Sequence, residues 1–280
     1  MPYIAPTPGD LHVNRPLSNI MIGYMIQADT YVADKVFPTV PVAQQSNSYF
    51  AMQRDSWNRD DMKIRAPATE SAGTTWEVSQ DAYWAPVRAV HHDIPDQTIA
   101  NADEVWNLDQ QATMLVSHKA MLNRELAFNS RFMTAGVWTF NAQGGTTSAA
   151  DGTYDPTNSA ANTRRYWSDP ASTPIEDIRQ AGSYVQMRTG LRPNTLVLTR
   201  LVWDKLQDHP DIIARLDRGQ TPNGPAIANR QALAAILELD NVWVMEGIFT
   251  SAKQGNNAAQ FAFIGGKSAL LVYVPATPGI

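Results

Sequence analysis

The residues most suggestive of chemistry are Gly265-Gly266-Lys267-Ser268, which match the end of a phosphate-binding loop. That loop requires a further glycine five positions before Gly266, and this sequence has Phe261 there. It also requires a helix directly afterwards, whereas Ala269 to Val274 has the composition of a strand. We therefore predict a turn between two strands, without a bound nucleotide or other cofactor.

A second candidate site is formed by His91, His92 and Asp93, which suggest metal ligands or an acid/base group. We interpret the two histidines as strand residues, which point to opposite faces and therefore do not bind one ion together. The remaining histidines are isolated and are interpreted as structural: His12, His118 and His209. The sequence has no Gly-x-Ser-x-Gly elbow and no Rossmann glycine motif. We predict no catalytic residue and no metal site, with a hydrolase-type enzyme using a carboxylate or one of these histidines as the alternative.

Composition narrows the classes of function further. The 280 residues are 44% apolar and include 8 tryptophans, enough for a real core in one large domain or two. A net charge of −5 argues against a wide basic surface for nucleic acid or an anionic membrane. The absence of cysteine excludes disulfides and thiolate sites. No apolar run approaches the roughly 18 residues of a membrane helix, and the first residues lack a secretory signal, so we expect a protein that works in water.

One long helix is predicted from Asn101 to Gly136 and organises the rest of the chain. Asn101 and Glu104 have capping-box spacing, Asn107 is a second candidate cap, and Gly136 is a suitable stop. One side of the predicted helix carries a mostly apolar stripe with three-then-four spacing: Leu108, Ala112, Leu115, Lys119, Leu122, Leu126, Asn129 and Met133. A helix of this length spans a whole domain.

The segment before residue 46 is predicted to be an arm. Residues 1–16 contain four prolines and are expected to be extended. A short amphipathic helix is expected next, with its apolar residues on one side: Leu17, Ile20, Met21, Tyr24 and Met25. So short a helix needs a surface, either the chain's own core or a neighbouring subunit. We predict the neighbouring subunit, with Leu17, Ile20, Met21 and Tyr24 as contact residues.

Residues 46–95 are predicted to form a long hairpin, with strands at Tyr49 to Gln53 and Trp76 to Val87. Its tip is rich in charges of both signs and poor in apolar groups. A solvated loop is one interpretation, and a contact with an adjoining molecule is the other. The predicted contact residues of the tip are Arg54, Trp57, Arg59, Lys63 and Arg65. Aromatic and basic residues here also resemble a nucleic-acid groove, but the interspersed acidic residues weaken that interpretation.

The second half of the chain is predicted to alternate helix and strand as a compact α/β unit does. Gln143 to Thr163 is expected to be a flexible loop. Helices and strands are then predicted in the order helix 173–189, strand 195–199, helices 201–207 and 211–216, helix 231–237 and strand 242–245. Phe261 to Ile264 and Leu270 to Val274 are predicted to pair as a hairpin.

This order of elements resembles the major capsid proteins of tailed bacteriophages, the family with the Hong Kong 97 fold. The resemblance covers nearly the whole chain and is carried by structural motifs. These are Asn107-Leu108-Asp109 and Asn123-Arg124-Glu125 of the long helix, Thr195 to Thr199 followed by Trp203, Asp204, Leu206, His209 and Pro210, and Phe261 to Lys267 with Leu270 to Pro275.

The resemblance implies an α+β fold with five segments: an N-terminal arm (1–45), an extended hairpin arm (46–95), a peripheral domain with a spine helix and a flexible loop (96–171), an α/β apical domain (172–260) and a return hairpin (261–280). It implies a structural subunit that assembles with itself into hexamers and pentamers of an icosahedral virion shell, formed in the host cytoplasm. Scaffold and portal proteins, a decoration protein, and packaged double-stranded DNA contacted non-specifically are the implied partners, without a membrane.

Two departures from the family pattern are visible. The front lacks the predicted coiled coil of about a hundred residues that some members carry, which implies a separate scaffold protein or an already processed chain. Family members also add strands to the peripheral domain after the last hairpin, so we expect some of these strands to be missing here. An enzyme and a monomeric binding module are the competing classes, and the size of the purified particle distinguishes them.

Overall fold

The computed structural model describes residues 30–52, 57–101, 107–146, 163–219, 229–252 and 261–275. These residues divide into two compact units. The described residues of 39–89, together with Pro275, form the smaller one, which we call the hairpin unit. The described residues of 30–38 and 90–274 form the larger one. Among all described helices, none is long and apolar enough to cross a bilayer.

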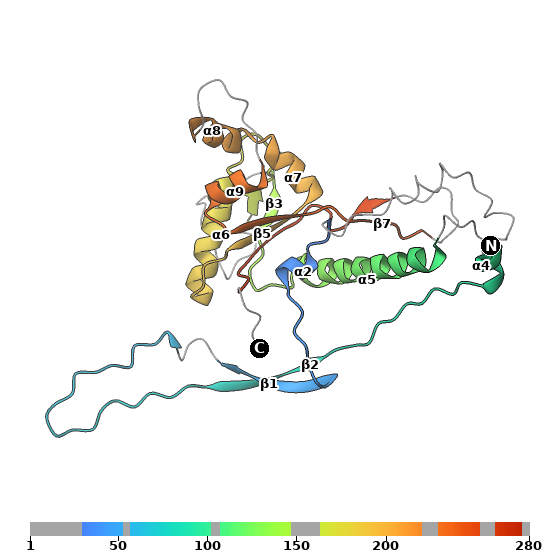
Figure 1. The fold of residues 1–280 in the computed structure, drawn as a ribbon. Helices are drawn as coiled ribbons and strands as arrows, with labels where there is room; N and C mark the ends of the chain where they lie inside the picture. Colours follow the sequence, from blue (N-terminus) through green and yellow to red (C-terminus); the bar gives the residue numbers. More distant parts are fainter. Residues whose placement is uncertain are drawn as a thin grey trace. The chain divides into compact units, whose positions relative to one another are not determined.

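The hairpin unit is built on two antiparallel strands, as predicted. Strand β1 (Ser46–Met52) pairs with β2 (Val78–Trp84), with Ser46 opposite Trp84 and Met52 opposite Val78. Figure 1 shows this pair and the long connection between its strands. The strands are seven residues each, so the second is shorter than the predicted 76–87. Two strands alone enclose no interior, and their side chains are mostly exposed.

The larger unit is organised around a three-stranded sheet with the order β6-β5-β9. Strand β5 (Thr195–Thr199) lies in the centre, parallel to β6 (Asn241–Met245) and antiparallel to β9 (Ala269–Val272). All five residues of β5 are buried. This burial explains why the strand is a nearly continuous apolar run, because a strand covered on both faces needs apolar residues at successive positions.

Four helices cover one face of this sheet: α6 (Pro174–Thr189), α7 (Arg200–Gln207), α8 (Pro210–Gly219) and α9 (Arg230–Leu237). Their apolar sides and the alternate sheet residues Leu196 and Leu198 form a first core. The predicted boundaries of α6 are confirmed, since it begins with Pro174 and ends before Gly190, whose φ is 74°. A left-handed residue at this position favours glycine.

The opposite face of the sheet packs against the long helix α5 (Leu108–Phe132) and the short helix α2 (Ala33–Val36). Val197, Met245 and Ile264 meet Phe128 and Val36 in this second core. The buried side of α5 is centred on Glu125 and Phe128, beside the predicted stripe. The valines and prolines of residues 36–42 predict an extended chain, and this prediction is wrong at Val36, on which α2 ends.

The predicted start of the long helix at Asn101 is wrong, and the alternative cap is confirmed. The Asn107 side chain accepts a hydrogen bond from the backbone N–H of Gln110 at 3.1 Å, which satisfies one free donor of the first turn of α5. Asn101 instead ends a separate short helix, α4 (Asp96–Asn101), and donates from its side chain to the carbonyl of Gln97. Helix α5 ends before Gly136, as predicted.

The hairpin predicted for residues 261–274 is also wrong. Strand β8 (Ala262–Phe263) pairs with β7 (Ile248–Phe249), while β9 joins β5 in the central sheet. Gly265 and Gly266, with φ values of 96° and 57°, turn the chain from one sheet to the other. A β-carbon on Gly265 would lie 2.7 Å from Thr199 Cγ2, so glycine is required there. The strand predicted after this turn is confirmed as β9. A phosphate-binding loop would be followed by a helix at this position.

The region predicted as a loop from Gln143 to Thr163 begins and ends in short strands. β3 (Gln143–Gly145) pairs in parallel with β4 (Thr163–Arg165), and residues 147–162 lie outside the described part. Gly144 allows this pairing, because a β-carbon there would lie 2.8 Å from the ring of Tyr166. The composition of the segment hid these strands, since glycine is rare in strand interiors.

Candidate functional site

The most unusual surface of the described chain is one face of the hairpin. Residues directly opposite in an antiparallel pair share a face, so Phe50, Val78 and Trp84 lie on the same side of β1 and β2. Their exposed fractions are 76%, 49% and 67%. We call this set the apolar hairpin face. The opposite face carries Tyr49, which is less exposed at 38%.

The connection between the strands carries more exposed apolar groups. Met62 and Ile64 are almost fully exposed, and the rings of Trp57 and Trp76 approach each other with centroids 6.2 Å apart. Apolar groups of this size in water are unfavourable unless another surface covers them. The hairpin therefore has the composition of a contact surface.

Charged groups order part of this connection. Arg59 binds both carboxylate oxygens of Asp61, at 2.7 and 3.1 Å, and the Thr74 hydroxyl donates to the same carboxylate at 2.9 Å. These hydrogen bonds hold the pKa of Asp61 below its ordinary value, with Arg59 as the largest cause. The hydrogen bond from Thr74 joins the two sides of the connection, so the connection is partly organised within one molecule.

The sequence-predicted contact residues separate into two groups. Trp57, Arg59, Lys63 and Arg65 all lie in the exposed connection of the hairpin. The others lie outside the described residues: Leu17, Ile20, Met21, Tyr24 and Arg54. The sequence prediction missed Phe50, Val78 and Trp84. The pairing of Ser46 with Trp84 places these three residues on one face, but the sequence alone does not show this register.

A second feature joins the start of the described chain to the long helix. The carboxylate of Glu125 on α5 accepts hydrogen bonds from the backbone N–H of Val32, at 3.1 and 3.2 Å, and of Ala33, at 2.8 Å. It thereby caps the first turn of α2, whose N-cap residue has no side-chain cap. Asp34 of α2 also pairs with Arg124. We call residues 31–36 the strap.

The Glu125 side chain is completely buried, and two opposing effects act on the pKa of its carboxyl group. Desolvation raises the pKa of its carboxyl group above the ordinary value, while the backbone hydrogen bonds from Ala33 and Val32 oppose this rise. The strap also contacts α5 through Tyr31, whose hydroxyl lies 3.4 Å from His118 Nδ1. Nothing in the sequence spacing pointed to this pairing, because 93 residues separate Val32 from Glu125.

The histidine candidates form no reactive centre in the part of the chain described. His91 and His92 do not lie in a strand, contrary to our interpretation, because β2 ends at Trp84 and the following residues have no strand partner among those described. His91 lies 3.7 Å from Asp93, and both side chains are largely exposed. His209 is buried, with Nε2 2.9 Å from the Ser172 hydroxyl. No group of three or more potential metal ligands occurs among the described residues.

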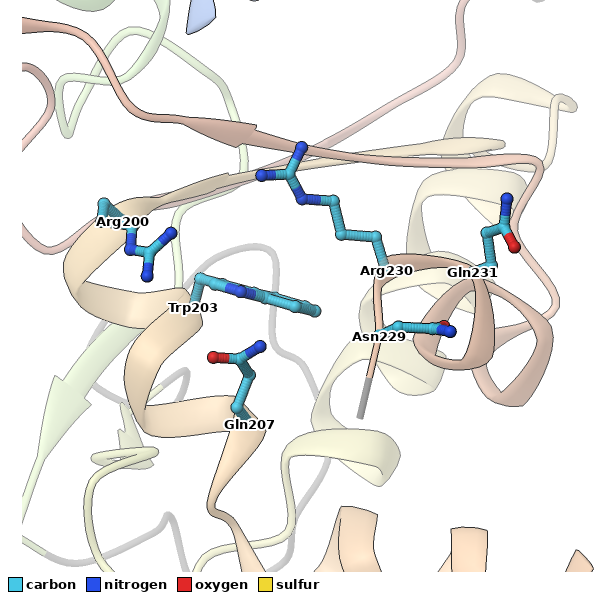
Figure 2. Close-up of a pocket in the computed structure, with 6 residues that line it drawn as sticks. All are labelled: Arg200, Trp203, Gln207, Asn229, Arg230 and Gln231. Atoms are coloured by element: carbon cyan, nitrogen blue, oxygen red, sulfur yellow. The ribbon is translucent and has the colours of Figure 1, made fainter. Parts of the chain in front are cut away.

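A shallow, open hollow lies between α7 and α9, lined by the residues in Figure 2. Trp203 forms part of its wall, and Arg200 and Arg230 lie on either side. The charges are largely compensated, because both arginines pair with Glu246 and Arg200 also pairs with Asp204. This hollow presents no nucleophile with a neighbouring base.

The chain was compared with protein families, with individual proteins and with solved structures. No family model matches the chain. It is 27% identical over 265 residues to the major capsid protein of Pseudomonas phage JBD67, covering 88% of this chain and 72% of that protein. It is 30% identical over 112 residues to the major capsid protein of Burkholderia phage BcepMu, covering 40% of this chain and 32% of that protein.

A solved structure shares the fold. A phage-related protein from Bordetella bronchiseptica RB50 superposes with a TM-score of 0.59 at 21% identity, covering 95% of this chain and 78% of that one. This chain therefore shares the mixed helix and strand fold of that protein.

Proposed function

We infer that this chain is a phage major capsid protein, a structural subunit of the virion shell. The observation that carries this inference is the sequence similarity across 88% of the chain to the major capsid protein of Pseudomonas phage JBD67. The same similarity agrees with the resemblance to phage major capsid proteins that the sequence motifs carry. The role is structural rather than enzymatic, in keeping with these relatives.

The finer assignment is to the Hong Kong 97 type of capsid fold. It is supported by the order of elements: a hairpin of β1 and β2, then the long helix α5, then the α/β unit of α6 to β6. We propose that α5 is the spine helix of the peripheral domain and that the α/β unit is the apical domain. The predicted segment boundaries at residues 45, 95, 171 and 260 belong to the same proposal.

The hairpin is the proposed contact between subunits. The apolar hairpin face would be covered by an adjoining copy, and the tip residues would set the position of that contact: Arg54, Trp57, Arg59, Lys63 and Arg65. A two-stranded ribbon is marginal alone, and an apolar face on such a ribbon gains stability when another molecule covers it. The contact of Leu17, Ile20, Met21 and Tyr24 with a neighbouring subunit stays a prediction.

Assembly into hexamers and pentamers of a closed icosahedral shell is proposed together with this role. A repeated contact between identical subunits builds a closed assembly when its geometry closes. Scaffold and portal proteins, and a decoration protein, are proposed partners during assembly in the host cytoplasm. The net charge of −5 suits a wall that contacts packaged double-stranded DNA without holding it.

Light scattering and negative-stain electron microscopy of the purified full chain test this function. Shells, capsomers or other large oligomers are the expected result. A protein that stays monomeric over a wide concentration range, with or without co-expressed phage assembly proteins, would contradict the capsid role.

A further inference from the structure

One segment of the hairpin connection alternates strictly between charged and apolar side chains: Asp61, Met62, Lys63, Ile64 and Arg65. The segment belongs to no helix or strand, and Figure 1 shows the connection as a long open run of chain. Successive side chains of an extended chain point to opposite sides. The two apolar residues therefore share one side of the segment, and the three charged residues share the other.

The apolar side of this segment is fully open to water. The exposed fractions of Met62 and Ile64 are 91% and 105%, the highest of the large apolar residues described. Neither residue belongs to a hydrophobic core of the described chain. Large apolar side chains gain free energy when another surface covers them, and a few such residues supply most of the free energy of a protein contact. The pair thus has the properties of an interface anchor.

Two contacts hold the segment in place within its own chain. The rings of Trp57 and Trp76 lie with their centroids 6.2 Å apart. Asp61 accepts hydrogen bonds from Arg59 at 2.7 and 3.1 Å and from Thr74, 13 residues further along the chain, at 2.9 Å. We call these last three residues the clasp. Because the clasp fixes the first residue of the segment, less conformational entropy is lost when the segment binds a partner.

The charges beside the anchor indicate the chemistry of that partner. Lys63 and Arg65 form no ion pair with another described residue, whereas Asp61 is already bound by Arg59. Apart from the neighbouring Asp60, the charge left on this stretch is therefore positive. The whole chain has a net charge of −5, so the surface of a second copy is on average attractive to it.

We propose that Met62 and Ile64 anchor the tip of the hairpin to a second copy of this chain, and that the clasp positions them for this contact. The anchor enters an apolar recess of the second copy, with acidic groups at its rim facing Lys63 and Arg65. The charged residues then determine the position of the contact, while the apolar pair supplies most of its free energy. This inference rests on the proposed function, because it requires copies of the chain to assemble.

Variants of the full-length chain test the anchor. Met62→Ser with Ile64→Ser should raise the subunit concentration needed for particle formation at least about tenfold, measured by sedimentation. The melting temperature of the free subunit should stay the same, because both side chains are already exposed. The control is Val87→Ser, which removes an apolar side chain exposed at 83% in the same unit but outside the connection.

The clasp is tested by combining substitutions. Asp61→Asn with Thr74→Val should raise the same threshold concentration in the natural chain, and clearly less in a chain that already carries Ile64→Ser, because a positioning group acts only through the anchor. Equal effects in both chains would overturn the positioning role.

The anchor itself has two contrary outcomes. An anchor variant that assembles as well as the natural chain, or a control that is impaired as strongly, would overturn it and leave the proposed function intact. A natural chain that forms no particles would overturn both.

Discussion

At the scale of single residues, Glu125 makes the hydrogen bonds that attach the strap to α5. It is fully buried, and its carboxylate satisfies backbone donors of a segment 92 and 93 residues away in sequence. A buried carboxylate is costly unless it is hydrogen-bonded. Here its hydrogen bonds cap α2 and fix the strap on α5, so one residue joins the start of the described chain to the long helix.

Replacing Glu125 by alanine removes the acceptor and leaves two buried N–H groups without it. We expect the free energy of unfolding to fall by about 1–3 kcal/mol, the cost of leaving buried donors unsatisfied. Denaturant unfolding of the subunit measures this change. Arg124→Ala is the matched control, because its exposed pair with Asp34 is worth at most about 1 kcal/mol. Equal losses in the two variants would show that Glu125 does not cap α2.

The pH dependence of stability follows from the same residue. Because desolvation raises the pKa of Glu125 in the folded state, folding favours its protonated form. Its favourable contribution is complete below the unfolded pKa of about 4.3 and is lost as pH rises through the folded value. Relative to Glu125→Gln, the natural chain should therefore gain stability between neutral pH and about pH 4. Unfolding curves of both proteins at the two pH values measure this, and a relative loss would reverse the sign we assign.

At the scale of elements, the hairpin and α5 share one property: each exposes apolar side chains that the described chain does not cover. The hairpin exposes Phe50, Val78 and Trp84 on one face, and α5 exposes Met114 and Leu115. In contrast, β5 is covered on both sides by helices. The centre of the α/β unit is thus covered within the chain, whereas the hairpin strands have no cover of this kind among the described residues.

This difference also explains which elements could be predicted from the sequence and which could not. Segments whose stability is local were found closely, such as α6 with Pro174 at its start and Gly190 after its end. Several errors arose at elements whose pairing partner is distant in sequence. Strand β9 pairs with β5 rather than β8, and Glu125 binds Val32, neither of which follows from nearby residues. The tip residues were predicted from their charges, but Phe50 and Trp84 required the register.

The apolar hairpin face gives a prediction at this scale. Phe50→Ser with Trp84→Ser should strongly reduce shell formation while changing the melting temperature of the free subunit little, because both side chains are already exposed there. Particle yield by sedimentation and subunit melting by circular dichroism are the two measurements. Tyr49→Ser on the opposite face is the control and should assemble more efficiently. Equal assembly of all variants would exclude this face as a contact.

The charged tip of the hairpin gives a second prediction at the scale of elements. Reversing Arg59 and Lys63 to glutamate breaks the Arg59 pair with Asp61 and places like charges together. Exposed pairs contribute only about 0–1 kcal/mol to one subunit, so its folding should be unchanged. In a shell the same contact is repeated in every copy, so we expect lower shell yield or stability, most clearly at low salt. Hydrogen exchange at residues 57–77 should show greater protection in particles than in free subunits, and equal protection would mean that the tip contacts no neighbour.

At the scale of the whole molecule, the chain combines a compact α/β unit with a long helix and an extended hairpin. We propose that other copies of the chain cover the apolar side chains that the hairpin leaves exposed. The similarity to two phage major capsid proteins supports this proposal. Under this proposal, assembly buries surface that the folding of one chain leaves exposed.

The most direct test of this account is electron cryo-microscopy of particles formed by the full-length chain. We predict closed shells in which Phe50, Val78 and Trp84 of each subunit are buried against an adjoining copy. The account would be contradicted if the chain formed no regular particles, or if the shells left this face of the hairpin open to solvent.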